Sequence, residues 1–283
     1  MENESENKAN KLLVYSLDCS GKVLFMRHGQ TWFNLAKPDP SRSYNPELSD
    51  AHLCPDGINQ ITSTQVEINK LNLETVYVSP YYRTLQTVTL ALEKYPNLSD
   101  LKVIVHPKLA EVVCASQEFI IDIRQARKDF NMDSKVKIDW SYFDKYIKES
   151  SKYDENFFYF ENIDNVNEEV KNETYLKLKK LYDVQSIDEF KKELINFWKG
   201  KHKKFGGYES GGHASKRFEE FKNFLKNEHK DSFNDTEKKI LCVSHKAYIR
   251  AAIDHEQKLA EKSKKKFNKS YQMKNGEIIS IFI

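Results

Sequence analysis

The sequence predicts an α/β protein, a three-layer αβα sandwich whose central sheet is mostly parallel. Four short β-prone runs are continuously apolar rather than alternating, which is typical of strands covered on both faces. They are Lys22–Met26, Thr75–Ser79, Lys102–His106 and Ile240–Ser244. Helical patterns lie between these runs, and a chain that alternates strand and helix forms a largely parallel sheet with helices on both sides.

The second run leads into the clearest predicted helix. Ser79 is a good N-cap residue, and Pro80 suits the first helical position, so we expect the helix to begin directly after the strand. An apolar stripe follows at helical spacing: Leu85, Val88, Leu92 and Tyr95.

Two more helices are expected before the last run. Ser186 to Glu189 has the pattern of a capping box ahead of an apolar stripe. A second stripe, Phe218, Phe221 and Leu225, marks the other helix.

The 283 residues are enough to bury a core without disulfides, and we expect one domain over residues 11–283. Residues 1–10 are predicted to be disordered. Residues 131–183 lack a sustained period and are interpreted as an insertion of helices and loops. Within it, we expect the aromatic side chains of Phe157–Phe160 to form core.

Composition argues against several classes of partner. The 45 basic and 42 acidic residues leave a net charge of +3, which does not indicate nucleic-acid binding. The acidic N-terminus, MENESENKANK, is unlike a signal or transit peptide, and no apolar stretch approaches membrane-spanning length. The four scattered cysteines predict free thiols. We therefore expect a soluble cytoplasmic protein without a membrane partner.

Charged and imidazole side chains follow three of the predicted strands. Arg27 and His28 come directly after the first run, Arg83 lies in the first turn of the helix after the second, and His245 follows the last. Open α/β sheets bind ligands at the carboxyl ends of their strands, so these side chains could converge on one pocket. Paired arginine donors hold phosphate oxygens, and a neutral imidazole can attack phosphorus. A second imidazole, protonated, can stabilise the transition state.

A phosphoryl-transfer site of this kind also needs a proton donor for the leaving alkoxide. A carboxyl group held partly dry near phosphate has a raised pKa, as a general acid requires. Glu111, shortly after the third run, is our candidate, and the nearby Glu118 is the alternative.

Together, these motifs resemble the histidine phosphatase superfamily, also called the phosphoglycerate mutase-like family. The resemblance lies in RHGQT with Asn34, LSDAHLCPDGINQI, VYVSPYYRTLQTV, LAE and VSH, which occur in the expected order and span most of the chain. The long gap before Asp50-Ala51-His52-Leu53 is most similar to the plant and fungal phosphoglycerate mutase-like proteins.

The resemblance implies a role for each matching residue. His28 would be the phosphorylated nucleophile and Glu111 the proton donor. The rest of the phosphate pocket would comprise Arg27, Arg83 and His245, with Gln30 and Asn34 as further contacts. No metal and no cofactor are implied. The sequence departs from the family at Lys246, where a small residue is common; a lysine there could bind an acidic substrate, point to solvent, or crowd the pocket.

Three functions are compatible with these residues. The favoured one is hydrolysis of a small phosphorylated substrate, of unknown identity, through a phosphohistidine on His28. A cofactor-dependent phosphoglycerate mutase is disfavoured, because LAEVVC from Leu109 to Cys114 replaces the mutase phrase expected at Glu111. A binding protein on the same fold, with little or no activity, is the third. We expect a monomer or a dimer.

Other candidates receive no role at this stage. The segment Gly207–Ser210 resembles the Gly-Glu-Ser phrase of the family with a tyrosine inserted, and is given no catalytic function. The remaining histidines lack metal-ligand spacing: His52, His106, His202, His213, His229 and His255.

Overall fold

The computed structural model describes residues 21–36, 45, 48–114, 118–119, 122–132, 134–200, 207–262 and 273–281. The segment predicted to be disordered, residues 1–10, lies outside these ranges.

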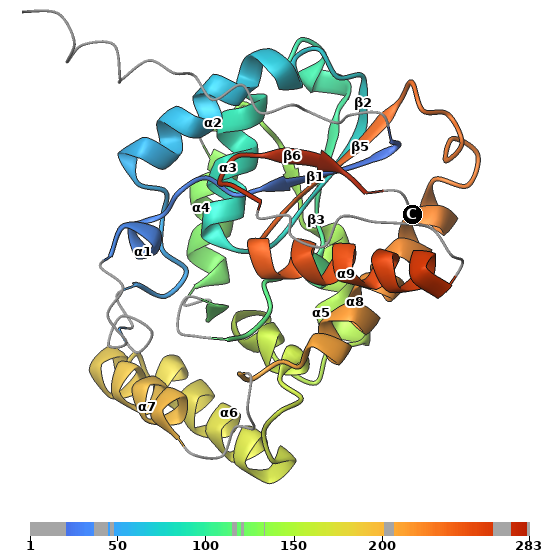
Figure 1. The fold of residues 1–283 in the computed structure, drawn as a ribbon. Coiled ribbons are helices and arrows are strands. Elements are labelled where there is room, and N and C mark those ends of the chain that lie inside the picture. Colours follow the sequence, from blue (N-terminus) through green and yellow to red (C-terminus); the bar gives the residue numbers. More distant parts are fainter. Residues whose placement is uncertain are drawn as a thin grey trace, which may run out of the picture.

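A six-stranded sheet forms the centre of the protein, in the order β4-β3-β2-β5-β1-β6 (Figure 1). Its strands are β1 (Val23–Arg27), β2 (Leu73–Val78), β3 (Lys102–Val105), β4 (Ile138–Asp139), β5 (Lys239–Ser244) and β6 (Ile278–Ser280). Neighbouring strands are parallel, except that β6 pairs with β1 in antiparallel orientation. The four predicted strands correspond to β1, β2, β3 and β5. The short edge strands β4 and β6 were not predicted.

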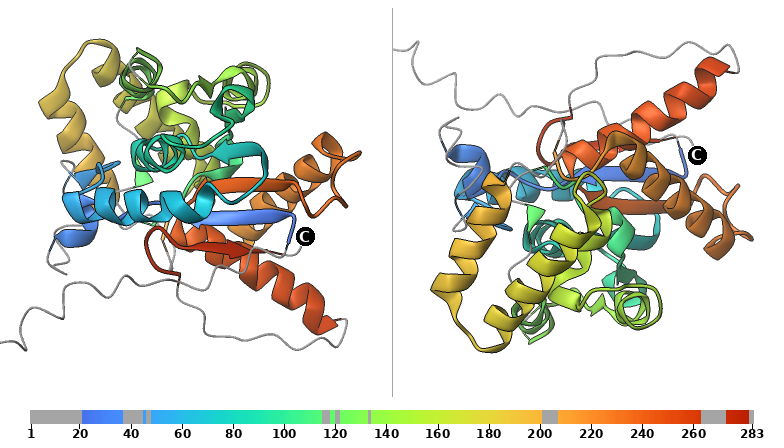
Figure 2. Two further views of the ribbon diagram at one scale, coloured as in Figure 1. Left: turned by 90° about the horizontal axis from the view of Figure 1, so that it is seen from above. Right: turned by 90° about the horizontal axis from the view of Figure 1, so that it is seen from below.

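Both faces of the sheet are covered by helices, which confirms the predicted fold class. Along β1, Leu24 and Met26 pack into one apolar core and Val23 and Phe25 into the other. The first core includes side chains of α2 (Pro55–Ile68), α3 (Tyr82–Leu92) and α4 (Ile123–Met132). The second includes side chains of α8 (Gly211–Glu228) and α9 (Lys246–Lys262), which lie together in Figures 1 and 2.

Helix α3 begins later than predicted, and Ser79 is not its N-cap. The helix starts at Tyr82, and Tyr81 in the N-cap position makes no side-chain capping bond. The carboxylate of Asp50, from a distant loop, accepts the Tyr82 N–H at 3.0 Å instead. The Ser79 hydroxyl is therefore available for another contact, with His245.

The predicted insertion, residues 131–183, contains both sheet and helix. Its elements are the edge strand β4, α5 (Ser141–Glu149), the 3-10 helix η6 (Glu155–Asn162) and α6 (Glu168–Asp183). Helix α6 packs against α7 (Ile187–Lys199) at one end of the molecule (Figure 1). Side chains of Phe157–Phe160 are at most 2% exposed, which confirms that this aromatic run is core.

Three short helices complete the described elements: α1 (Trp32–Leu35), η3 (Leu98–Asp100) and η4 (Pro107–Leu109). Within the described ranges, no helix combines the length and the apolar character that crossing a bilayer requires.

Candidate active site

His28 and His245 leave the sheet side by side. Strands β1 and β5 are parallel neighbours in which Arg27 lies opposite Ser244, so the next residue of each strand emerges at the same edge. The backbone N–H of His28 donates to the carbonyl of Ser244 at 3.1 Å. The centroids of the two imidazole rings are 5.3 Å apart. The structure thus brings together two histidines that are 217 positions apart in the chain.

A cavity of about 390 Å³ opens beside His28. Six of the eight predicted site residues line it: Arg27, His28, Asn34, Arg83, Glu111 and Lys246. The other lining residues are Thr31, Phe33, Ala51, Val112, Cys114, Glu118, Ala247 and Arg250. The two remaining predicted residues, Gln30 and His245, do not line the cavity.

The turn that carries His28 is held against α2 by close backbone packing. A Cβ atom at Gly57 would lie 2.0 Å from the carbonyl oxygen of Gln30, so only glycine fits there. The same carbonyl accepts the N–H of Cys54 at 2.9 Å. The side-chain amide of Gln60 donates to Gln30 Oε1 at 3.1 Å. The Gln30 side chain therefore supports the turn and does not line the cavity.

The buried His28 ring has the protonation state of a nucleophile. Its Nδ1 lies 2.7 Å from the carbonyl oxygen of Gly29, and because a carbonyl can only accept, Nδ1 must carry the hydrogen. Burial, reinforced by the positive charges of Arg83 and Arg27, lowers the pKa of His28 well below its ordinary value. The neutral ring therefore keeps its lone pair on Nε2.

His245 is fully buried and is also neutral in the absence of a ligand. Burial, Arg83 and the neighbouring His28 lower the pKa of His245 well below its ordinary value. Its Nε2 bonds the hydroxyl of Ser79 at 2.8 Å, and its Nδ1 has no hydrogen-bond partner among the described residues. The protonated state expected from the sequence thus requires a bound anion to offset these effects.

Arg83 is buried and paired with a carboxylate that the sequence analysis did not single out. Its Nη1 donates to Asp50 Oδ1 at 3.2 Å, and its guanidinium lies 4.5 Å from the ring centroid of Tyr81. Burial raises the pKa of Asp50 to about 6, although Arg83 and the Tyr82 N–H favour the charged form. Asp50 both caps α3 and offsets the unfavourable position of a cation in the first turn of a helix.

Glu111 lies against the first turn of α9. Its Oε1 accepts the N–H groups of Val112 at 2.8 Å and Tyr248 at 3.0 Å, and its Oε2 accepts that of Ala247 at 3.4 Å. Burial raises the pKa of Glu111 above its ordinary value, against the opposing effects of Arg83 and these three backbone groups. A buried, oriented carboxyl group with a raised pKa can act as a general acid.

A buried ion pair holds the loop that carries Glu111. Arg217, on α8, bonds both carboxylate oxygens of Glu209 at 3.0 Å and donates to the carbonyls of Lys108 and Ala110 at 2.8 and 2.7 Å. Glu209 Oε2 accepts the N–H of Val113 at 3.1 Å. Glu209 belongs to the segment that received no catalytic role, and the structure shows it as part of this clamp.

The remaining predicted contacts lie at the cavity wall and rim. The Nη1 of Arg27 donates to the carbonyl of Met273 at 3.1 Å. The Oδ1 of Asn34 accepts the N–H of Thr31 at 3.1 Å in the capping box of α1, which leaves its amide NH₂ as a donor. Lys246 is exposed at the first position of α9.

Among the residues of the site that were not assigned from the sequence, three are charged: Asp50, Glu118 and Arg250. Asp50 stands inside the quoted LSDAHL phrase, so its motif was visible although its bond to Arg83 was not. Glu118 was weighed only as an alternative to Glu111; it is buried, and its backbone carbonyl accepts from the Tyr81 hydroxyl. Arg250 carries no sequence signal, because its place in the cavity follows from helix geometry.

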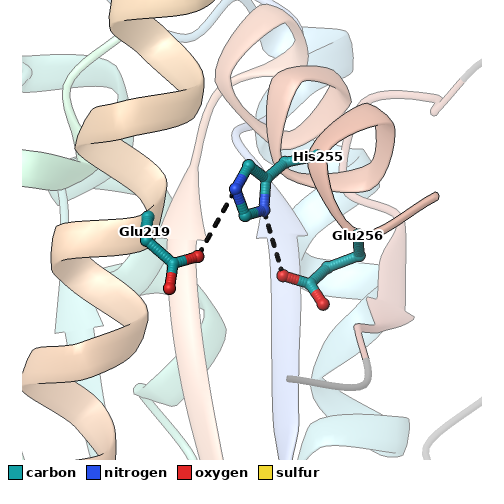
Figure 3. A group of neighbouring side chains, drawn as sticks. All are labelled: Glu219, His255 and Glu256. Carbon is teal, nitrogen blue, oxygen red and sulfur yellow. Dashed lines mark hydrogen bonds and ion pairs between the residues drawn. The ribbon is translucent and has the colours of Figure 1, made fainter. Parts of the chain in front are cut away.

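One group outside the cavity has the residue types of a metal site. Among the described residues, Glu219, His255 and Glu256 place ligand atoms within 4.8 Å of one another (Figure 3). The ammonium of Lys222 lies 3.1 Å from Glu219 Oε2 and 2.8 Å from Glu256 Oε1. Lys222 already supplies the positive charge that these carboxylates need. The four side chains, Glu219, Lys222, His255 and Glu256, therefore form an ion network.

Residues 23–139 match the sequence profile of the histidine phosphatase superfamily, branch 1. No curated protein matches the sequence. Among solved structures, phosphoserine phosphatase from Entamoeba histolytica in complex with 3-phosphoglyceric acid is 17% identical, over 90% of this chain and 87% of its own, with a TM-score of 0.39. A mycobacterial glucosyl-3-phosphoglycerate phosphatase is 14% identical, over 90% and 88%, with a TM-score of 0.45. Phosphoglycerate mutase from Bacillus anthracis is 15% identical, over 92% and 88%, with a TM-score of 0.43.

The family match confirms the resemblance at the level of the superfamily. The matched residues include Arg27, His28, Arg83 and Glu111, whereas His245 lies beyond them and joins the group through the pairing of β1 with β5. The finer resemblance to plant and fungal proteins stays a prediction.

Proposed function

Residues 23–139 belong to the histidine phosphatase superfamily, and from that premise we propose that this enzyme hydrolyses a phosphomonoester through a phosphohistidine formed on His28. The observation that carries the proposal is the placement of His28. Its ring is buried, directs Nδ1 to the carbonyl of Gly29, and lines a cavity that also contains Arg27 and Arg83. Burial and the two arginines lower the pKa of His28, which favours the neutral, nucleophilic ring.

In the first step, Nε2 of His28 attacks phosphorus while the bond from phosphorus to the ester oxygen breaks. Arg27 and Arg83 hold the phosphoryl oxygens and keep phosphorus in line with the imidazole. Glu111 gives its proton to the departing alkoxide, so the alcohol leaves neutral.

In the second step, water attacks the phosphohistidine and the nitrogen–phosphorus bond breaks. Glu111, now ionised, takes a proton from the water, which restores its starting state together with that of His28. His245 does not line the cavity, but its ring centroid is 5.3 Å from that of His28, so a phosphoryl dianion bound at His28 opposes the effect of burial and raises the pKa of His245. His245 takes up a proton from solvent when the substrate binds and returns it when phosphate leaves; while protonated, it stabilises the charge that spreads over the phosphoryl oxygens in both steps.

The decisive experiment combines turnover with trapping of the intermediate. We expect the wild-type protein to release phosphate from 4-nitrophenyl phosphate at mildly acidic to neutral pH, with a chelator present and no added metal. His28→Ala should reduce release to the background rate. After mixing with substrate that carries a radioactive phosphoryl group, the wild-type protein should become labelled, and the label should be lost in acid and kept in alkali, as expected of phosphohistidine. His28→Ala should carry no such label.

His255→Ala is the matched control, because His255 belongs to the ion network outside the cavity. It should keep both turnover and label. Label transfer to an added sugar acid, rather than to water, would favour the mutase alternative. Folded wild-type protein with neither turnover nor label would contradict the proposal and favour the binding-protein alternative.

A further inference from the structure

Two basic side chains at the rim of the cavity are not used by the proposed reaction. Lys246 and Arg250 both line the cavity, and both are exposed. They lie four residues apart on α9, so their side chains stand one above the other on the same face of the helix.

The position of Glu111 shows which part of a substrate would meet these two residues. Glu111 accepts the backbone N–H groups of Ala247 and Tyr248, which directly follow Lys246. A general acid must touch the oxygen of the leaving group. The leaving group therefore departs over the N-terminal end of α9, where Lys246 lies in the first turn and Arg250 at the start of the second.

Two of the four cations that line the cavity already have a role in the proposed reaction. Arg27 and Arg83, both close enough to His28 to lower its pKa, hold the phosphoryl dianion, whereas Lys246 and Arg250 lie apart from them on α9. The ion pair of Arg250 with Asp254 is long, at 3.9 Å, and exposed, so it holds the guanidinium weakly.

We propose that Lys246 and Arg250 form a subsite for a second anionic group, a carboxylate or a phosphoryl group, carried by the leaving group of the substrate. This inference rests on the proposed function, since it takes the leaving group to be the part released at Glu111. It narrows the substrate class to phosphate esters of anionic alcohols.

Turnover of substrates that differ only in charge tests the subsite. The wild-type enzyme should prefer 4-carboxyphenyl phosphate over the neutral 4-carbamoylphenyl phosphate by about 5- to 10-fold in kcat/KM, the range that two exposed ion pairs supply. The preference should fall to about 2-fold in Lys246→Ala and Arg250→Ala and vanish in the double variant. It should also weaken in 0.5 M salt.

Lys258→Ala is the matched control, since Lys258 is an exposed lysine three turns further along α9 and does not line the cavity. This variant should keep the full preference. Equal kcat/KM values for the charged and neutral substrates in the wild-type enzyme would overturn the subsite and leave the phosphatase proposal standing.

Binding of phosphonates separates the subsite from catalysis. Calorimetric titration with 4-carboxybenzylphosphonate, 4-phosphonobenzylphosphonate and neutral 4-carbamoylbenzylphosphonate should give a lower Kd for both anionic compounds. The double variant should bind all three equally. If the wild-type protein shows this difference in Kd but turns over no phosphate ester, the subsite stands and the proposed function fails. Equal Kd values for all three in the wild-type protein overturn the subsite.

Discussion

At the scale of single residues, the contacts of Glu111 suit a proton donor. Glu111 is oriented by three backbone N–H groups, two of them from α9, and burial raises its pKa. Glu118 is the other buried carboxyl group that lines the cavity. The orientation and the raised pKa of Glu111 favour it as the proton donor.

Glu111→Gln tests that assignment through the leaving group. A general acid acts only while protonated, so transfer to His28 should be fast below the raised pKa of Glu111 and slow as the pH rises through it. In single-turnover experiments, Glu111→Gln should slow phosphoryl transfer from phenyl phosphate by about 10²- to 10⁴-fold and remove this falling limb. With 2,4-dinitrophenyl phosphate, whose leaving group needs no proton, the effect should be small. If Glu118→Gln shows this pattern instead, the assignment is wrong.

Six of the fourteen residues that line the cavity could be found from the sequence, because they stand in or beside motifs next to strand ends. Arg27, His28 and Arg83 are examples. The sequence predicts a neutral His28 and a raised pKa for Glu111 only from what the reaction requires, because the burial and the neighbours that cause these shifts come from residues far apart in the chain. Ser79 illustrates the limit: the sequence predicts a helix cap, whereas the fold uses its hydroxyl to hold His245.

At the scale of elements, the loop that carries Glu111 depends on α8. Arg217 bonds the carbonyls of Lys108 and Ala110, and Glu209 bonds the N–H of Val113, so the two ends of the loop are held by one ion pair. Arg217 and Glu209 do not line the cavity. We interpret them as positioning residues for Glu111.

Removing the positive charge of this pair should lower both the stability and the activity of the protein. Arg217→Met removes the arginine from the buried Glu209 carboxylate, which keeps only its weaker contacts such as that with His213 Nδ1 at 3.1 Å, and should lower the free energy of unfolding, measured in denaturant, by about 3–5 kcal/mol. It should also lower kcat by about 10- to 100-fold, because Glu111 is displaced. Arg217→Met with Glu209→Gln should recover part of the stability. Arg124→Met, which breaks an exposed ion pair with Glu155, should cost less than about 1 kcal/mol. Equal losses of unfolding free energy in Arg217→Met and Arg124→Met would contradict the proposed role of the Arg217–Glu209 pair.

At the scale of the whole molecule, aromatic packing joins the predicted insertion to the rest of the core. Phe119, which follows the cavity residue Glu118 in the chain, packs on Tyr159 at 4.8 Å and on Trp198 at 4.9 Å between ring centroids. Phe160 contacts Phe197 at 5.9 Å. These rings belong to the same apolar core as the strand residues Leu24 and Met26. We therefore expect one cooperative unit.

Phe160→Ala tests this cooperativity. The substitution empties a fully buried position and should lower the free energy of unfolding by about 3–5 kcal/mol. Unfolding should stay a single transition, with the same midpoint by tryptophan fluorescence and by far-ultraviolet circular dichroism. Leu176→Ala, at a position 62% exposed, should change stability by less than about 0.5 kcal/mol. Two separated transitions in the wild-type protein would show that residues 131–183 form a separate unit.

By itself, the sequence determines four strands of the sheet, the fold class, and the superfamily motifs around His28, Arg83 and Glu111. These follow from local hydrophobic pattern and motif spacing, which are properties of the chain alone. The tertiary structure decides the edge strands β4 and β6, the Asp50 cap, the Arg217–Glu209 clamp and the meeting of Lys246 with Arg250 at the cavity. Each of these depends on partners distant in sequence or on which face of a helix meets the cavity, and no local pattern encodes that choice.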